Sequence, residues 1–324
     1  MKKILVVIPF HEQQKIEVAK IAPKLQVIYK EDQAATAEEI LDANIIIGNV
    51  DPTILKESKK LEWIQLNSAG ADAYIQQGVL PEGVKLTNAS GAYGLAISEH
   101  MLGAALCLKK KLYLYQDNMK KHRWLDEGEV TSIWNSTVLV IGVGDIGSEF
   151  AKRIHMLGAK VLGIRKHRTE KPEYLQGLYQ MDALPELLQQ ADIVALTLPG
   201  TKELTKFFGK EEFAAMKKDA IFINVGRGSL VDEEALCEAL ISGGIAGAAI
   251  DVTAVEPLPE DSPLWDCPNL ILTPHISGQY HLPETLERIK QISMNNLKAF
   301  VNEEPLCNEV DFQSGYCSFH QSRV

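Results

Sequence analysis

A run of apolar residues that ends in three spaced glycines constrains this chain more than any other feature. The stretch from Val138 to Gly147 reads Val-Leu-Val-Ile-Gly-Val-Gly-Asp-Ile-Gly. A buried strand followed by G-x-G-x-x-G at the start of a helix lets the backbone approach a pyrophosphate, and the helix N-terminus faces its charge. A glycine-rich turn after a strand also occurs in proteins that bind no nucleotide. The surrounding sequence therefore has to decide between the two interpretations.

The length and charge of the chain limit the classes of function. Its 324 residues favour two domains, and its composition is that of a globular protein with a large core. The net charge of −10 argues against non-specific nucleic-acid binding, because no basic surplus neutralises phosphates. A small anionic substrate remains compatible with it, since a local cationic site can lie in an acidic protein.

Cysteines and apolar runs indicate the compartment. The five cysteines include no C-x-x-C pair, which predicts reduced thiols and neither a disulfide framework nor a metal site. The N-terminal apolar run ends at Pro9 after five residues, which favours a first β-strand over a signal peptide. No apolar run approaches transmembrane length. We therefore expect a cytoplasmic protein with no membrane partner and no metal.

The first ninety residues predict a small α/β domain. Short apolar runs at 4–8, 27–29, 45–47, 61–66 and 85–88 alternate with helical patterns, which predicts a parallel sheet with helices on both faces. The segment Asn67–Asp72 follows one of these strands. Taken alone it reads as a tight turn, although its small residues could also expose backbone N–H groups to an anion.

Residues 97–122 carry the longest helical pattern. Apolar residues recur at steps of three and four, with Ser98 as a possible N-cap, and this predicts one continuous helix that connects two domains and offers a dimer surface. Residues 282–301 predict a final helix, and residues 313–324 a loose polar tail.

The glycine motif opens a second, larger α/β unit. Six strands are predicted at 138–143, 160–164, 193–198, 220–225, 248–252 and 270–273, with helices at 148–157, 184–190, 210–216 and 233–242. This is the plan of a dinucleotide-binding domain, so the context favours the nucleotide interpretation of the motif.

The position about twenty residues beyond the glycines distinguishes NAD from NADP. An NAD site usually carries an acidic residue there for the ribose 2′-hydroxyl, whereas this chain has Arg165, followed by Lys166, His167 and Arg168. A guanidinium pairs bidentately with a 2′-phosphate. The sequence favours NADP over NAD. The alternative is a solvated basic run in an NAD enzyme.

Three further segments follow predicted strands of the second domain and carry Arg227, Glu256 and His275. Strand ends of one parallel sheet converge, so these residues can meet although they lie far apart in sequence. Each alone has an ordinary structural interpretation, but together they make an acid–base pair with an anion-binding arginine. His275 can supply a proton to a developing alkoxide, Glu256 can favour its protonated form, and Arg227 can hold a carboxylate and polarise a keto oxygen.

These motifs, in this order and spacing, resemble those of the D-2-hydroxyacid dehydrogenase family. The matching segments are the glycine motif, Asn-Val-Gly-Arg-Gly, Asp-Val-Thr-Ala-Val-Glu-Pro-Leu and Thr-Pro-His-Ile-Ser-Gly. The resemblance implies Arg227, Glu256 and His275 as the catalytic trio. It implies a substrate site at Ser68, Ala69 and Gly70 together with Arg227 and His275. It also implies cofactor contacts at Gly142, Gly144, Asp145, Ile146, Gly147, Leu198, Pro199, Val225, Gly226, Asp251 and Gly278. The basic run adds Arg165, Lys166 and Arg168 as candidate contacts of the cofactor.

The resemblance also implies an architecture and an activity. The fold is α/β with two doubly wound parallel-sheet domains: a discontinuous, flavodoxin-like substrate domain (1–98 and 286–324) and a Rossmann-type dinucleotide domain (99–285). The expected activity is NAD(P)-dependent reduction of a small 2-keto acid to the D-2-hydroxy acid by a homodimer. A phosphoglycerate dehydrogenase-like enzyme and a nucleotide-sensing, corepressor-like binding protein are the alternatives. Arg165 departs from the usual acidic residue and supports NADP.

Overall fold

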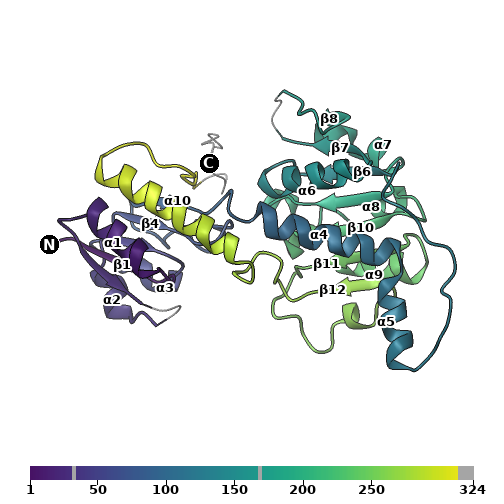
Figure 1. Cartoon of the computed structure of the whole chain (residues 1–324), viewed down its shortest axis with the longest axis horizontal. Helices are drawn as coiled ribbons and strands as arrows, with labels where there is room; N and C mark the ends of the chain where they lie inside the picture. The colour runs from purple at the N-terminus through teal and green to yellow at the C-terminus, as the bar shows by residue number, and fades with distance from the viewer. Residues whose placement is uncertain (31–33, 167–169, 313–324) are drawn as a thin grey trace. The chain divides into compact units, whose positions relative to one another are not determined.

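The computed structural model describes residues 1–30, 34–166 and 170–312 (Figure 1). The chain divides into two compact units, one formed by Met1–Tyr93 with the segment that begins at Leu282, and the other by Gly94–His281. The first unit is therefore discontinuous in sequence. The two boundaries predicted from the sequence, at 98 and 285, lie a few residues further along.

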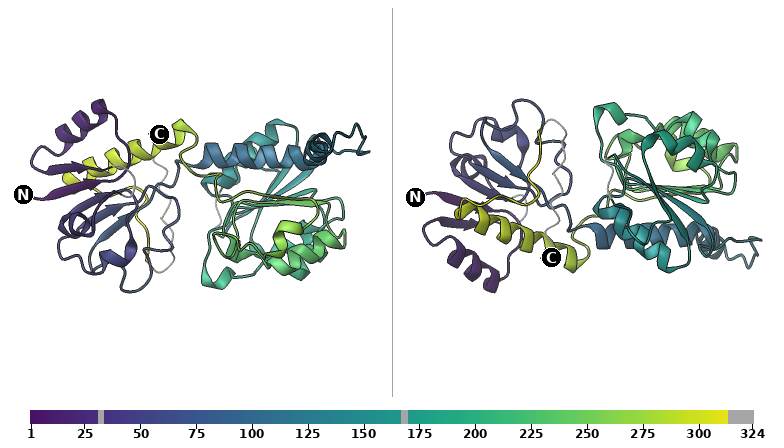
Figure 2. Two further views of the ribbon diagram at one scale, coloured as in Figure 1. Left: turned by 90° about the horizontal axis from the view of Figure 1, so that it is seen from below. Right: turned by 90° about the horizontal axis from the view of Figure 1, so that it is seen from above.

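A five-stranded parallel sheet forms the centre of the first unit. Its order is β2-β1-β3-β4-β5, that of flavodoxin-like folds. The strands are β1 (Lys3–Val6), β2 (Gln26–Tyr29), β3 (Ile45–Ile47), β4 (Trp63–Gln65) and β5 (Lys85–Thr87). The helices are α1 (Glu12–Ile21), α2 (Ala37–Asp42), α3 (Pro52–Leu55) and α10 (Pro283–Val301). Helices α1 and α10 lie on one face and α2 and α3 on the other (Figure 2), so the triple isoleucine of β3 is buried.

The second unit contains a seven-stranded parallel sheet in the order β12-β11-β10-β9-β6-β7-β8. Its strands are β6 (Thr137–Ile141), β7 (Lys160–Ile164), β8 (Gly177–Tyr179), β9 (Ile193–Leu196), β10 (Ile221–Asn224), β11 (Gly247–Ile250) and β12 (Leu270–Leu272). The strand order reverses between β6 and β9, as in Rossmann-type sheets, so the loops after these two strands flank the expected ligand crevice. The predicted fold class is confirmed. The sequence missed β8, a three-residue edge strand.

Helices and short 3₁₀ turns cover this sheet. The helices are α4 (Gly94–Lys109), α5 (Leu112–Lys120), α6 (Asp145–Met156), α7 (Leu184–Leu188), α8 (Lys210–Ala215) and α9 (Glu233–Ile241). The 3₁₀ turns are η1 (Met181–Ala183), η2 (Lys202–Leu204), η3 (Gly228–Leu230) and η4 (Pro263–Asp266). A tight aromatic cluster of Phe208, Phe213 and Phe222 joins α8 to the sheet.

The prediction of one continuous helix over residues 97–122 is wrong. Helix α4 ends at Lys109 and α5 starts at Leu112, with Lys111 between them in the left-handed region at φ 53°. Ser98 is not an N-cap. It is buried inside α4, and its Oγ donates a hydrogen bond to the Leu95 carbonyl at 2.9 Å. The apolar spacing continues across the break, so periodicity alone could not reveal the turn.

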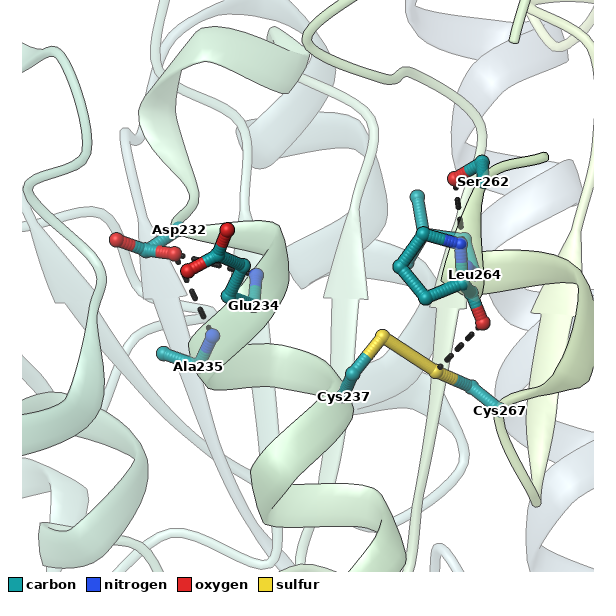
Figure 3. The surroundings of a disulfide bond; sticks show 8 residues. Asp232, Glu234, Ala235, Cys237, Ser262, Leu264 and Cys267 are labelled. Carbon is teal, nitrogen blue, oxygen red and sulfur yellow. Dashed lines mark hydrogen bonds between the residues drawn. A yellow bond between two sulfur atoms is a disulfide. The ribbon is translucent and has the colours of Figure 1, made fainter. Parts of the chain in front are cut away.

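The prediction of reduced thiols is wrong for one pair of cysteines. Cys237 on α9 and Cys267, just after η4, form a disulfide (Figure 3). Cys107 and Cys307 are free. Thirty residues separate the bonded cysteines. Their pairing follows from the packing of α9 against η4, which no local spacing pattern indicates.

Two kinds of feature are absent from the described part of the chain. No helix there is both long and apolar enough to cross a membrane. No three His, Cys, Asp or Glu side chains there are grouped so as to hold a metal ion. The predicted tail at 313–324 lies outside the described residues.

Candidate active site

The glycine turn after β6 is as tight as the sequence predicts. Gly142 has φ +104°, and a Cβ on Gly147 would lie 2.2 Å from the Gly142 carbonyl oxygen, so neither position accepts a side chain. At Gly144 a Cβ would meet nothing within 4 Å, so the backbone is open there just before α6 begins at Asp145. A close turn, an open glycine and a helix N-terminus fit a bound pyrophosphate.

Strand β7 ends at Ile164, and Arg165 follows it. The Arg165 N–H donates to the Tyr179 carbonyl of β8 at 3.0 Å, which fixes the backbone of Arg165 at the edge of the sheet. Arg165 is half-buried and Lys166 is exposed. Arg168, also predicted at the cofactor, lies outside the described residues, so its part in the site stays a prediction.

The loop after β10 is shaped by Asn224. Its buried side chain accepts a hydrogen bond from Gly226 N at 3.0 Å and donates to the Arg227 carbonyl at 3.2 Å. A Cβ on Gly226 would lie 2.3 Å from the Leu198 carbonyl oxygen, so this loop packs directly against the one after β9. Arg227 lies beside Gly200 of that loop, where a Cβ would be 3.0 Å from Arg227 Cγ.

Glu256 and His275 form a hydrogen-bonded pair. Glu256 Oε2 lies 2.7 Å from His275 Nδ1, and both side chains remain partly exposed, at 38% and 48%. The other Glu256 oxygen accepts the Thr253 N–H at 3.0 Å, which holds the carboxylate in place. A carboxylate on Nδ1 fixes the tautomer of the ring and directs Nε2 the opposite way. No hydrogen bond to Nε2 is found among the described residues, which leaves it available to a substrate.

Asp251, at the end of β11, anchors the loop that carries His275. Its carboxylate is buried and accepts the backbone N–H groups of Ile276 and Ser277, each at 3.0 Å, as well as the hydroxyls of Thr273 and Ser277. The Asp251 carbonyl accepts the His275 N–H at 2.8 Å, where His275 has φ 52° in the left-handed region. These hydrogen bonds together hold the segment from Thr273 to Ser277 against the end of β11.

His100, on α4, is not among the residues predicted from the sequence. Its Nε2 lies 3.4 Å from Thr273 Oγ1. The single proton of that hydroxyl goes to Asp251, so His100 donates to Thr273 and extends the anchor to α4. A lone histidine in an otherwise apolar helical stretch was the available signal.

The order of the strands in the sheet determines which of the predicted residues lie close together. The ends of β10, β11 and β12 are neighbours in the sheet, which brings the loops of Arg227, Glu256 and His275 side by side. Of the other predicted cofactor residues, Ile146 lies in the first turn of α6. The rest lie on the loops after β9, β10, β11 and β12: Leu198, Pro199, Val225, Gly226, Asp251 and Gly278.

In the first unit, the loop after β4 has an unusual hydrogen-bonding pattern. Each carbonyl from Asn67 to Gly70 accepts a hydrogen bond. The donors, in order, are Tyr93 OH, Ala89 N, Asn88 Nδ2 and Ser68 Oγ. The N–H groups of Ser68, Ala69 and Gly70 donate to no described residue. Three successive free N–H groups on a loop of small residues suit an anionic group, which favours the second interpretation of this segment over a plain turn.

Comparison with known proteins identifies the family. Residues 102–277 match the model of the D-isomer specific 2-hydroxyacid dehydrogenase, NAD-binding domain. The chain belongs to the D-isomer specific 2-hydroxyacid dehydrogenase family. It is an oxidoreductase that uses a nicotinamide cofactor to interconvert a 2-keto acid and a 2-hydroxy acid, as the sequence predicted.

Relatives match over nearly the whole chain. Glyoxylate/hydroxypyruvate reductase B of Pectobacterium carotovorum is 34% identical over 278 residues, which are 83% of this chain and 84% of that protein. A family member from Aeromonas salmonicida has a TM-score of 0.84 at 32% identity, covering 96% and 99% of the two chains. The NADPH-dependent glyoxylate/hydroxypyruvate reductase of Sinorhizobium meliloti, solved with NADP and sulfate, has a TM-score of 0.82 at 25% identity, covering 98% and 100%.

Proposed function

We propose that this enzyme reduces small 2-keto acids of the glyoxylate and hydroxypyruvate class with NADPH, using His275 as the general acid. The observation that carries the proposal is the pair of Glu256 and His275, joined at 2.7 Å through Nδ1 at the strand ends next to Arg227. The relative from Pectobacterium carotovorum named above supports the substrate class.

Each residue of the trio has a distinct task in this scheme. When bound, the nicotinamide supplies a hydride to the keto carbon. His275 Nε2 donates a proton to the oxygen of that carbon, and Glu256 stabilises the positive charge of the ring before the transfer. Arg227 binds the substrate and polarises the keto oxygen. In the oxidative direction the same ring accepts the proton.

The loop from Ser68 to Gly70 is the proposed site for the substrate carboxylate. Its three N–H groups, which donate to no residue in the described part of the chain, provide donors without a fixed positive charge, and its carbonyls all accept hydrogen bonds from other groups. Backbone N–H groups grouped in this way bind anions well. This assignment explains why the segment consists of small residues that leave the backbone accessible.

NADPH is the proposed coenzyme, and Arg165 is the proposed contact of its 2′-phosphate. Arg165 follows β7, where enzymes selective for NAD carry an acidic residue. The structure of the Sinorhizobium meliloti relative was solved with NADP. Arg165→Asp should lower kcat/KM for NADPH by about tenfold or more and spare or improve NADH, because one bidentate contact is replaced by repulsion. A wild-type enzyme that prefers NADH would contradict the assignment.

The reaction is tested directly by the loss of NADPH absorbance. Glyoxylate, hydroxypyruvate, 2-ketopantoate and branched 2-keto acids are supplied in turn, and the product is checked for the D-isomer. Turnover of glyoxylate or hydroxypyruvate with kcat/KM above that of the branched acids is the expected result. An absence of turnover with every member of the panel would favour the nucleotide-binding, non-catalytic role.

We also propose that the enzyme is a homodimer joined through α5 and the segment that follows it. This region carries large apolar side chains that are exposed in the monomer: Leu112, Met119, Trp124, Leu125, Val130 and Trp134. Figure 1 shows α5 and the loop after it at the periphery of the second unit. Apolar surface of this extent is usually covered by a partner. Light scattering at micromolar concentration should give the dimer mass, and a monomer would contradict the proposal.

A cytoplasmic location is proposed as well. Cys107 and Cys307 are free thiols, as is usual in a reducing compartment, although the Cys237–Cys267 disulfide is uncommon there. Fractionation of cells that express the tagged protein checks the location, and recovery outside the cytoplasm would contradict it.

A further inference from the structure

The four bonded carbonyls of the loop from Asn67 to Gly70 control where its N–H groups point. A peptide unit is planar, so the carbonyl of one residue and the N–H of the next have fixed, opposite directions. The bond from Tyr93 OH to the Asn67 carbonyl therefore sets the direction of the Ser68 N–H. The bond from Asn88 Nδ2 to the Ala69 carbonyl, at 2.7 Å, sets that of the Gly70 N–H.

Without these side chains the two peptide units could rotate. Gly70 has no Cβ, so the peptide between Ala69 and Gly70 can flip at low steric cost and present its carbonyl oxygen where the N–H had been. An oxygen at that place would repel a carboxylate. The middle carbonyl, that of Ser68, is held by the Ala89 backbone N–H at 2.9 Å and does not depend on a side chain.

Both side chains are fixed in a state that can only donate at these contacts. Tyr93 is 5% exposed, and burial raises the pKa of its hydroxyl far above its ordinary value, so the proton is retained at working pH. Asn88 is 3% exposed, and its Oδ1 accepts the Ser90 N–H at 3.1 Å, which leaves Nδ2 as the group that faces Ala69. The Asn88 backbone is held in turn by Asn308, whose carbonyl accepts the Asn88 N–H at 3.2 Å.

We propose that Tyr93 and Asn88 are positioning residues that hold the Ser68 and Gly70 N–H groups toward the substrate carboxylate. Neither side chain touches the substrate, and each acts through one peptide unit. The proposal rests on the proposed role of this loop in carboxylate binding. It predicts a loss of selectivity for the charged acid, beyond any general loss of stability.

The test compares two buried tyrosines of the same unit. Tyr93→Phe removes only the hydroxyl that holds Asn67. Tyr74→Phe is the matched control, because the Tyr74 hydroxyl donates to the Val50 carbonyl and accepts the Val50 N–H, and it makes no bond to this loop. NADPH oxidation is measured with glyoxylate and with methyl glyoxylate, which keeps the reacting carbon and lacks the carboxylate charge. The readout is the ratio of the two kcat/KM values.

The ratio of acid to ester should fall about three- to tenfold in Tyr93→Phe, the range expected for one hydrogen bond, and stay at the wild-type value in Tyr74→Phe. KM for NADPH and the melting temperature should be similar in the two variants. Asn88→Asp keeps the acceptor for Ser90 and removes the donor, and Asn88→Leu removes the donor without adding charge. Both should lower the ratio about tenfold or more, because the Ala69 carbonyl loses its side-chain donor.

Two results would count against these conclusions, and they differ. If the wild-type enzyme shows no preference for glyoxylate over its methyl ester, the loop does not bind the carboxylate and the proposed function of the loop is wrong. If the wild type shows the preference and Tyr93→Phe and Asn88→Leu keep it unchanged, the positioning role is wrong while carboxylate binding stands.

Discussion

Replacing Asp251 by asparagine should both destabilise the second unit and slow the reaction. The carboxylate accepts two backbone N–H groups, from Ile276 and Ser277, one on each oxygen. The two hydroxyl donors of Thr273 and Ser277 can rotate to accept a hydrogen bond, but a backbone N–H cannot. Whichever way the side chain of the introduced asparagine is turned, its NH₂ group faces one of those N–H groups and leaves it without an acceptor.

The magnitude follows from the number of bonds changed. One buried N–H without an acceptor costs about 1–3 kcal/mol, and each remaining bond loses about 1 kcal/mol when its acceptor becomes neutral. With three remaining bonds, the sum is roughly 4–6 kcal/mol of unfolding free energy. For a unit of this size each kcal/mol corresponds to about 2–4 °C in Tm. Because the loop carries His275, we also expect kcat to fall, by about tenfold or more if misplacement is near 1 Å.

The assay is urea unfolding of the enzyme without cofactor, and tryptophan fluorescence monitors the unfolding. Trp124, Trp134 and Trp265 lie in the second unit, and only Trp63 lies in the first. Asp261→Asn is the control, because this substitution removes the same charge from an aspartate that is exposed. A change below about 0.5 kcal/mol in Asp251→Asn, the usual range for surface substitutions, would refute the anchoring role, because it would show that the four bonds contribute nothing net.

Three further predictions concern the chemistry and the stability of the second unit. His275→Ala should lower kcat about a hundredfold or more with little effect on KM for NADPH, and an unchanged kcat would remove it from the mechanism. Reducing the Cys237–Cys267 disulfide should lower the unfolding free energy by about 3–4 kcal/mol, since it closes a loop of 30 residues, and dithiothreitol should have no such effect on Cys237→Ser. Burial alone would raise the pKa of Asp192. Its ion pair with Lys217 at 2.8 Å, the hydrogen bond from the Thr137 N–H at 2.7 Å and the charge of Lys109 together outweigh burial and hold that pKa below its ordinary value. The stability that Asp192 contributes in this way is present above a pH of about 4 and is lost as the pH falls through the lowered pKa. In urea unfolding, the free energy of unfolding of Asp192→Asn should therefore decline less in acid than that of the wild type. The same pH dependence in the two proteins would contradict this prediction.

The sequence determined the fold because its strongest patterns have few structural solutions. A run such as Ile45–Ile47 can bury all its side chains only in a strand covered on both faces, and it does so in β3. Gly142 and Gly147 stand where close contacts exclude any Cβ, so only glycine fits there and the spacing of the two residues can be recognised in the sequence as a motif. The order of strand ends likewise allowed Arg227, Glu256 and His275 to be grouped before their geometry was known.

Other features depended on contacts between residues that are distant in sequence. Periodicity could not show the left-handed residue at Lys111 that divides the long helix, because the apolar spacing continues through it. The pairing of Cys237 with Cys267 required the packing of α9 on η4. No local pattern linked Tyr93 to the Asn67 carbonyl.

There is a physical reason why the sequence predicts some of these features and only the tertiary structure shows the others. Local sequence specifies which backbone segments must be buried or must turn, since burial and steric exclusion act on each residue and its neighbours. Only the tertiary structure decides which polar groups meet, because hydrogen bonds depend on distances of a few tenths of an ångström. Thus the sequence left the loop at Ser68–Gly70 as either a turn or an anion site. In the tertiary structure its carbonyls are bonded while three of its N–H groups have no partner in the described chain, and this supports the anion site that we propose.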